Sequence, residues 1–169
     1  MKPVEVPPIG GETVLPGAQF ADAYTVTVAG LDLDAISAAT LAFGRAPAWI
    51  NRLLHVRNAL VAPFRLKAGR MAIGDPSGRI GIFPVLHQST QQIILGLDDR
   101  HLDLRLRVDV ADHGLGHQTI TASTFVKTHN LFGRAYLLAI LPFLRVIVKT
   151  MLAQTLREPL AHAVRQMSA

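Results

Sequence analysis

The sequence predicts an α+β fold in which a curved antiparallel sheet and two short helices are covered by a long C-terminal helix enclosing a cavity. Three strand-like runs, Gln91–Leu97, His101–Val110 and Gln118–Thr128, follow one another late in the chain. One long apolar helix then begins directly after His129 and Asn130. Two shorter helical patterns precede these strands, so helices and strands are segregated along the chain, which is typical of α+β proteins.

The composition is that of one globular domain, which we expect to span residues 1–169. Half of the residues are hydrophobic, cysteine is absent and the formal net charge is +5. The basic residues are scattered and not interleaved with exposed aromatic residues, which argues against a nucleic-acid interface. The start of the chain has no apolar signal region, and the apolar run Ala135–Leu144 is shorter than the roughly 20 residues that span a bilayer. We therefore expect a cytoplasmic protein.

The N-terminal part begins with an irregular arm, residues 1–19, rich in proline and glycine. Ala21–Ala29 alternates apolar and polar residues, which predicts a half-buried strand. Asp32 or Asp34 is expected to cap a helix that continues to about Phe43. The apolar spacing predicts that this helix buries one side, formed by Ile36, Ala39, Thr40 and Phe43.

The middle part of the chain predicts one more helix before the meander of strands. Ala48–Leu60 has helical spacing and begins just after Pro47. A short strand within Arg65–Asp75 is followed by a turn signal that ends at Gly78. Ile80–Gln88 is expected to be a strand with a bulge or an edge at Pro84.

The final helix carries a narrow basic stripe on an otherwise apolar surface. Arg134, Arg145 and Lys149 lie within about 60° of one another on a helical wheel. So narrow a polar stripe predicts that a concave partner encloses the helix, and the preceding strands are the obvious partner. Pro142 removes one helical hydrogen bond, which favours a bend that follows a curved sheet.

Four segments of the chain carry recognisable motifs: Trp49…Leu53…Arg57–Val61, Phe83–Val85, Gly96–Asp103 and His129-Asn130-x-x-Gly133-Arg134-x-Tyr136…Ile140-x-Pro142-Phe143. With these motifs the chain resembles an uncharacterised bacterial family, domain-of-unknown-function family 2867, of the START-like (SRPBCC, helix-grip) superfamily. The resemblance covers about Phe20 to Leu152. It implies an internal cavity between sheet and C-terminal helix, as in lipid-transfer, hormone-receptor and cyclase-like relatives, and some members joined to dehydrogenase-like domains. Leu144 stands where a polar histidine is expected.

The densest polar stretch, Asp98–Asp109, alternates charged and apolar residues. This alternation predicts an outer face stabilised by cross-strand ion pairs, in preference to an acid/base row at a cavity mouth. Asp98, Asp99 and His101 lie nearest the turn and are the better candidates for a site.

Two further motifs have a functional interpretation beside a structural one. At the strand-to-helix junction, Asn130 is a reasonable N-cap, and Arg134 could bind an anionic head group near the helix N-terminus. Alternatively, His129 and Arg134 only fasten the helix to the sheet. The segment Asp112–His117 contains two histidines, but its glycines predict a hairpin loop and no metal site.

We therefore expect a protein that binds a hydrophobic or amphipathic small molecule, with no cofactor and no metal. The alternatives are a cyclase- or hydratase-like enzyme that uses Asp99, His101 or His129 as acid or base, and an accessory domain of an oxidoreductase. Contact with a membrane surface and a homodimer are the other possible partners. The expected ligand-binding residues are Trp49, Phe83, His101, Leu104, Phe125, Arg134, Tyr136, Ile140 and Phe143.

Overall fold

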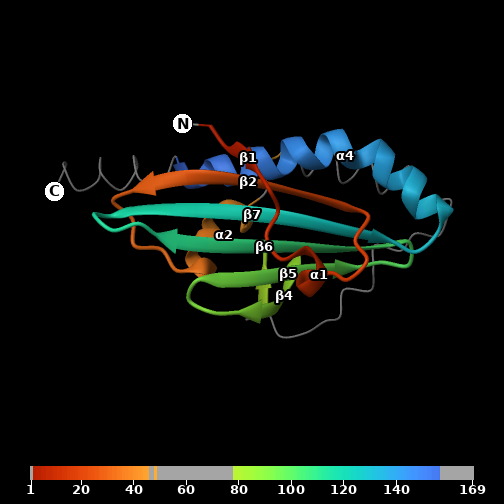
Figure 1. Cartoon of the computed structure of the whole chain (residues 1–169), viewed down its shortest axis with the longest axis horizontal. Helices are drawn as coiled ribbons and strands as arrows, with labels where there is room; N and C mark the ends of the chain where they lie inside the picture. The colour runs from red at the N-terminus through yellow and green to blue at the C-terminus, as the bar shows by residue number, and fades with distance from the viewer. Residues whose placement is uncertain (1, 46–47, 49–77, 157–169) are drawn as a thin grey trace.

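A computed structural model describes residues 2–45, 48 and 78–156. These residues form a seven-stranded antiparallel sheet with the strand order β1-β2-β7-β6-β5-β4-β3. The long strands are curved, and they run side by side across the molecule (Figure 1). The strands are β1 (Val4–Val6), β2 (Phe20–Ala29), β3 (Arg79–Ile80), β4 (Phe83–Gln88), β5 (Gln92–Asp98), β6 (Leu102–Asp112) and β7 (His117–Thr128).

Helices cover both faces of this sheet. The helices α2 (Ala35–Phe43) and α4 (Leu131–Leu152) pack on one side, which we call the inner face. The short helix α1 (Gly11–Val14) lies on the other side, which we call the outer face (Figure 1). A 3-10 turn, η3 (Ala153–Leu156), continues α4. The predicted α+β helix-grip architecture is confirmed.

Three details differ from the prediction. The N-terminal arm is not wholly irregular, because it contributes strand β1 and helix α1. The expected strand Ile80–Gln88 is two strands, since Gly81 turns the chain with a φ of 59°. The bulge lies between Val85 and His87, one residue after Pro84. The predicted helix Ala48–Leu60 and the predicted strand within Arg65–Asp75 lie outside the described residues, apart from residue 48.

Helix α2 starts where an aspartate caps it and packs through small side chains. Asp34 accepts a hydrogen bond from the backbone N–H of Ser37 at 2.7 Å, which confirms the expected N-cap. The buried face differs from the predicted one, because Ile36 is exposed. Alanines let the helix approach the sheet closely, and its buried residues are Ala35, Ala38, Ala39, Ala42 and Phe43.

The register of the strands assigns each residue to one face. Leu104 pairs with Val126 and Leu97, and Arg105 pairs with Phe125. Because neighbouring residues of a strand point to opposite faces, the leucines of β6 lie on the inner face and its arginines on the outer face. The predicted alternation of the Asp98–Asp109 stretch is therefore confirmed.

Among the described residues, the inner face carries two apolar clusters. The larger cluster joins α2 and the end of α4 to the sheet through residues such as Val26, Val108 and Leu152. The smaller cluster has Leu102, Val126 and Leu137 at its centre and lies under the first half of α4. Leu104 touches both clusters, so the two meet near the start of β6.

Helix α4 is not enclosed in the way its composition predicts. It buries Leu137, Val148, Met151 and Leu152 against the sheet. Its opposite side exposes apolar residues, and Leu138 is 71% exposed. The helical stretch Leu131–Leu156 is also long and apolar enough to cross a membrane by length and composition alone. A mostly buried core helix of a soluble protein can pass the same test, whereas only 17% of this apolar window is buried in the described structure.

Candidate functional site

The inner face holds a group of polar side chains beneath α4, next to the smaller apolar cluster. Asp22 on β2 and Thr124 on β7 are partners in the strand register, and Tyr24 follows Asp22 on the same face. All three are buried, and Asp22 is 6% exposed. We call Asp22, Tyr24 and Thr124 the buried polar group. It interrupts an otherwise apolar surface, where a polar atom is costly unless it has a partner.

The hydrogen bonds of this group are incomplete. The Tyr24 hydroxyl donates to Asp22 Oδ2 at 3.3 Å. Among the described residues, Asp22 Oδ1 and Thr124 Oγ1 have no hydrogen-bond partner although both atoms are buried. Most buried polar atoms in native proteins are satisfied. The two side chains therefore either bind one another, as the hydrogen-bonding effect of Thr124 on the pKa of Asp22 indicates, or bind a further molecule.

Two cations of α4 lie over the same region. The Arg145 Nε atom is 3.8 Å from Asp22 Oδ2, and the Arg145 guanidinium lies 5.7 Å from the centre of the Phe20 ring. The Lys149 ammonium lies 4.6 Å from the centre of the Tyr24 ring. The predicted basic stripe of the helix therefore reaches the sheet at β2. The Arg145 side chain is half exposed, so its ion pair with Asp22 is weak.

Burial dominates the ionisation of this group. Removal from water raises the pKa of the Asp22 carboxyl above 3.8, while Tyr24, Thr124 and Arg145 act in the opposite direction. Burial and the negative charge of Asp22 raise the pKa of Tyr24 to about 12. The carboxylate form of Asp22 is therefore less stable in the folded protein than in the unfolded chain.

The raised pKa of Asp22 predicts a pH-dependent gain in stability for Asp22→Asn. The folded protein binds more protons at Asp22 than the unfolded chain does, so the contribution of Asp22 to stability is greatest below its unfolded pKa. That contribution falls as the pH rises through the unfolded value towards the raised folded value. We expect Asp22→Asn to melt a few degrees above the wild type at pH 7 and close to it at pH 4. Thermal unfolding followed by circular dichroism measures both.

Asp32→Asn is the control for this experiment, because Asp32 is exposed and also precedes α2. It removes the same charge from the chain without touching the buried polar group. A wild type that is as stable as Asp22→Asn at pH 7 would contradict the prediction.

Beside the buried polar group, part of the inner face stays accessible. Leu104 lies near the start of β6 and is only partly buried, whereas Leu102 and Leu106, its neighbours on the same face, are buried. Leu97, the register partner of Leu104, is also partly buried. On the helix side, Tyr136, Ile140, Leu141 and Leu144 pack against the smaller cluster with partial burial. Apolar surfaces of helix and sheet therefore face one another here without excluding all solvent.

The structure brings together only some of the expected ligand-binding residues. Leu104, Tyr136 and Ile140 meet at the smaller cluster, while Phe83 packs against the larger one. Phe143 is 50% exposed. Trp49 lies outside the described residues.

Phe125 is a correction, because its register places it on the outer face. It is fully buried there, close to Gly11 at the start of α1. The aromatic ring is therefore part of the packing under the N-terminal arm and does not face α4.

The strand-to-helix junction is held by side chains that were candidates for catalysis. Asn130 caps α4 by accepting from Gly133 N at 2.8 Å, and its amide nitrogen lies 2.9 Å from His101 Nδ1. His129 Nε2 lies 3.0 Å from Asp103 Oδ2. The ring of His101 also packs on Phe132, with 5.0 Å between the ring centres. This geometry supports the fastening role expected of His129, and it adds His101 to the same junction.

Asp99 and Arg134 occupy more open positions. An Asp99 side-chain oxygen accepts from the backbone N–H of Arg100 at 2.6 Å, so it helps to shape the turn between β5 and β6. Arg134 is exposed on α4 and forms no ion pair with the described residues. An anion site at this helix end would have to do without Gly133 N, because Asn130 already binds it.

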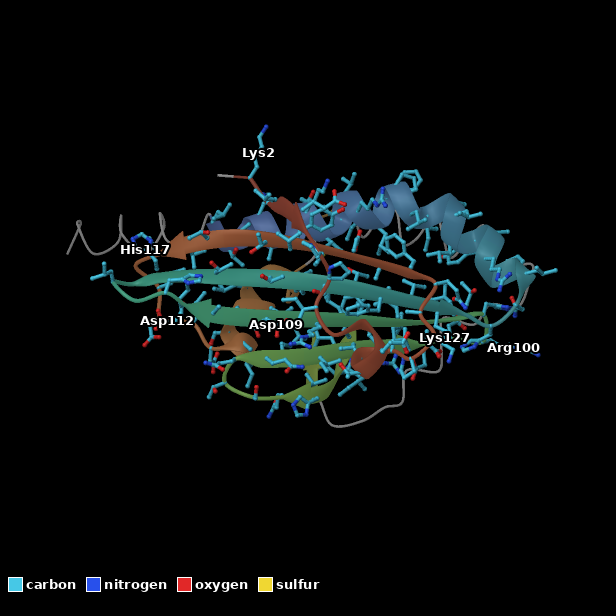
Figure 2. The ribbon with its side chains drawn as sticks, in the orientation of Figure 1. Lys2, Arg100, Asp109, Asp112, His117 and Lys127 are labelled. Carbon is cyan, nitrogen blue, oxygen red and sulfur yellow. The ribbon has the colours of Figure 1, made fainter. Side chains whose placement is uncertain are left out.

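The other charged motifs have structural partners. Arg107 and Asp109 form a bidentate ion pair on the outer face, with contacts of 2.7 to 3.0 Å, and Arg105 pairs with Asp98. Figure 2 shows Asp112 and His117 at one end of the sheet and Arg100 at the other, so the glycine-rich hairpin is remote from the junction. In the described part of the chain, no group of three or more His, Cys, Asp or Glu side chains is placed to hold a metal ion.

The buried polar group was missed at the level of sequence, although a signal for it exists. The alternation that identifies Tyr24, Val26 and Val28 as buried also assigns Asp22 and Phe20 to the same face, two and four residues earlier. An aspartate in phase with buried residues is a candidate functional group. Thr124 carries no such signal, because β7 is buried on both faces from Thr121 to Val126.

The sheet, the covering helix and the polar group between them define a helix-grip domain with a buried polar site. The chain belongs to the family described as "Protein of unknown function (DUF2867)", whose model matches residues 14–151. The family resemblance of the sequence is thereby confirmed. A search of curated proteins found no match.

Among solved structures, the chain is similar to one described as a START superfamily protein from Mycobacterium smegmatis. The two share 12% sequence identity with a TM-score of 0.40, over 80% of this chain and 98% of the other. A likeness at this level adds nothing to the description of the site, which depends on the residues of this chain.

Proposed function

We propose that this protein binds a small apolar or amphipathic molecule between the inner face of the sheet and the first half of α4. The observation that carries the proposal is the partial burial of Leu104 between the buried Leu102 and Leu106. A leucine on the inner face of an interior strand, beneath a helix, is normally packed on all sides. Its accessible surface indicates room for another apolar group.

The helix residues opposite Leu104 support the same proposal. Tyr136, Ile140 and Leu144 are apolar or amphipathic, and they retain accessible surface beside the smaller cluster. Covering such surface with a ligand is favourable by roughly 25 cal/mol for each Å² of apolar area removed from water. Concave sites of mainly apolar lining with a few polar groups are what small hydrophobic ligands require.

The enzyme alternative has no comparable support. Both candidate histidines have partners at the strand-to-helix junction, and Asp99 shapes a turn. The buried polar group lies on β2 and β7, away from these residues in the register. Binding, not acid/base chemistry, is therefore the function we propose.

Leu104→Phe tests the proposal, because it fills the space without adding polarity. Where a ligand site exists above Leu104, the larger side chain should lower the affinity for the neutral dye Nile red about tenfold while leaving the free energy of unfolding unchanged. In a fully packed core the same change would cost about 1–3 kcal/mol of stability. Fluorescence titration and urea denaturation measure the two quantities.

Leu138→Phe is the matched control, because Leu138 lies on the exposed side of the same helix. It should change neither the dye affinity nor the stability. The proposal fails if the wild type shows no saturable binding, or if Leu104→Phe lowers stability and leaves binding intact.

A further inference from the structure

We propose that the ligand ends in a hydroxyl group, which binds Asp22 and Thr124. This inference rests on the proposed function and specifies the chemical class of the ligand: an apolar molecule with an alcohol at one end. The two unsatisfied buried atoms, Asp22 Oδ1 and Thr124 Oγ1, are the recognition elements.

The register of the sheet puts these two side chains next to the proposed apolar site. On the inner face, one row across the strands contains Phe20, Val126, Leu104 and Leu97. The next row contains Asp22, Thr124 and Leu106. The two rows are adjacent. A molecule that lies along the first row, over Leu104, is therefore one residue row away from the buried polar group at the β2 side of the sheet.

A hydroxyl group matches both unsatisfied atoms at once. Its hydrogen can be donated to Asp22 Oδ1, and its oxygen can accept the hydrogen of the Thr124 hydroxyl. Hydrogen bonds to a carboxylate in a buried site are among the stronger ones in proteins. The pair therefore provides both affinity and orientation for an alcohol.

Two other common end groups fit less well. A carboxylate would be attracted by Arg145 and Lys149, but it would bring a second negative charge against Asp22, whose charged form burial already destabilises. An ammonium group would enter a region that holds the cations Arg145 and Lys149, the first of them 3.8 Å from Asp22. A neutral donor and acceptor avoids both repulsions.

A purely structural role would require Asp22 and Thr124 to complete each other's hydrogen bonds, or a buried water to complete them. Asp22 and Thr124 are flanked on the inner face by Phe20, Tyr24, Val126 and Ala122, so apolar residues would suit these positions. Their unsatisfied atoms lower the stability of the folded protein. Destabilising polar groups of this kind are typical of functional sites, where a bound group completes their hydrogen bonds.

A series of decyl compounds tests the inference. Decan-1-ol, decanoate and decylamine share one apolar chain and differ only in the end group. Isothermal titration calorimetry at pH 7 should show decan-1-ol binding the wild type about tenfold or more tightly than either charged compound. Thr124→Val, which keeps the shape of the side chain, should lower the affinity for decan-1-ol about tenfold and that for decanoate much less.

Asp22→Asn is the second variant, because it keeps the shape of the side chain and removes its charge. It should also weaken decan-1-ol binding. Asp32→Asn, at an exposed position, should leave the affinity unchanged.

The outcomes separate this inference from the proposed function. If no decyl compound and no Nile red binds, the proposed function itself fails. If all three decyl compounds bind alike and neither variant changes their affinity, ligand binding stands and the hydroxyl assignment is overturned, with a buried water as the partner of Asp22 and Thr124. Tighter binding of decylamine that depends on Asp22 would also overturn it, in favour of a cationic ligand.

Discussion

Gly133→Ala is expected to lower the free energy of unfolding by about 3 kcal/mol, the opposite of what helix propensity predicts. Gly133 lies in the first turn of α4, where alanine would ordinarily stabilise the helix by up to about 1 kcal/mol. Here a Cβ atom would overlap the carbonyl oxygen of His101, which is backbone and cannot move aside cheaply. That oxygen also accepts the hydrogen bond from His129 N at 2.9 Å. Relieving the overlap would therefore separate the helix from the sheet at this end.

Urea denaturation compares this variant with Ala135→Gly, at an exposed position of the same turn. The control should lose only the propensity difference of about 1 kcal/mol. A Gly133→Ala protein as stable as the wild type would show that the junction has room to adjust. The contact between α4 and the loop before β6 would then be looser than the structure indicates.

The strands and helix ends were predictable because they depend on local chemistry. Alternation identified β2 and β6, whose inner residues are apolar and whose outer residues are largely polar or small. Asp34 and Asn130 were predictable as N-caps, since short polar side chains satisfy the free N–H groups of a first turn. Both signals are confined to a few neighbouring residues, so tertiary packing does not erase them.

Features set by long-range packing were harder to predict. The N-terminal arm appeared irregular because β1 is short and exists only through its pairing with β2. Ile36 and Thr40 appeared to belong to a buried stripe, yet α2 packs through alanines, which carry little hydrophobic signal. The exposure of Leu138 and Phe143 on α4 likewise depends on which surface another element covers.

The candidate site shows the same division. Leu104, Tyr136 and Ile140 were predictable from apolar periodicity, because each lies in phase with buried neighbours. Asp22 was in phase as well, but a single aspartate in a strand is easily assigned to the surface. His101 and His129 attracted attention for their chemistry, whereas their structural partners were visible only in three dimensions. The residue types of His101 and His129 suggested acid/base chemistry. The strand register, by contrast, determines which polar side chains are buried beneath α4.

Phe125→Ala is expected to destabilise the protein by about 3–5 kcal/mol while leaving ligand affinity unchanged. The ring is fully buried on the outer face, where Gly11 of α1 approaches it. Its removal leaves a cavity that the rigid sheet cannot close, and Gly11 of the N-terminal arm loses this aromatic neighbour. Binding of decan-1-ol, measured at a temperature where the variant is folded, should not change, since the sheet separates this ring from α4.

Phe143→Ala is the matched control, because it removes the same side chain from a half-exposed position on α4. It should cost less than about 1 kcal/mol, as exposed substitutions usually do. The comparison tests which face of the sheet binds the ligand. If Phe125→Ala reduced decan-1-ol affinity tenfold while Leu104→Phe had no effect, the ligand would bind under the N-terminal arm. The outer face would then be the functional one, and the buried polar group beneath α4 would have no part in recognition.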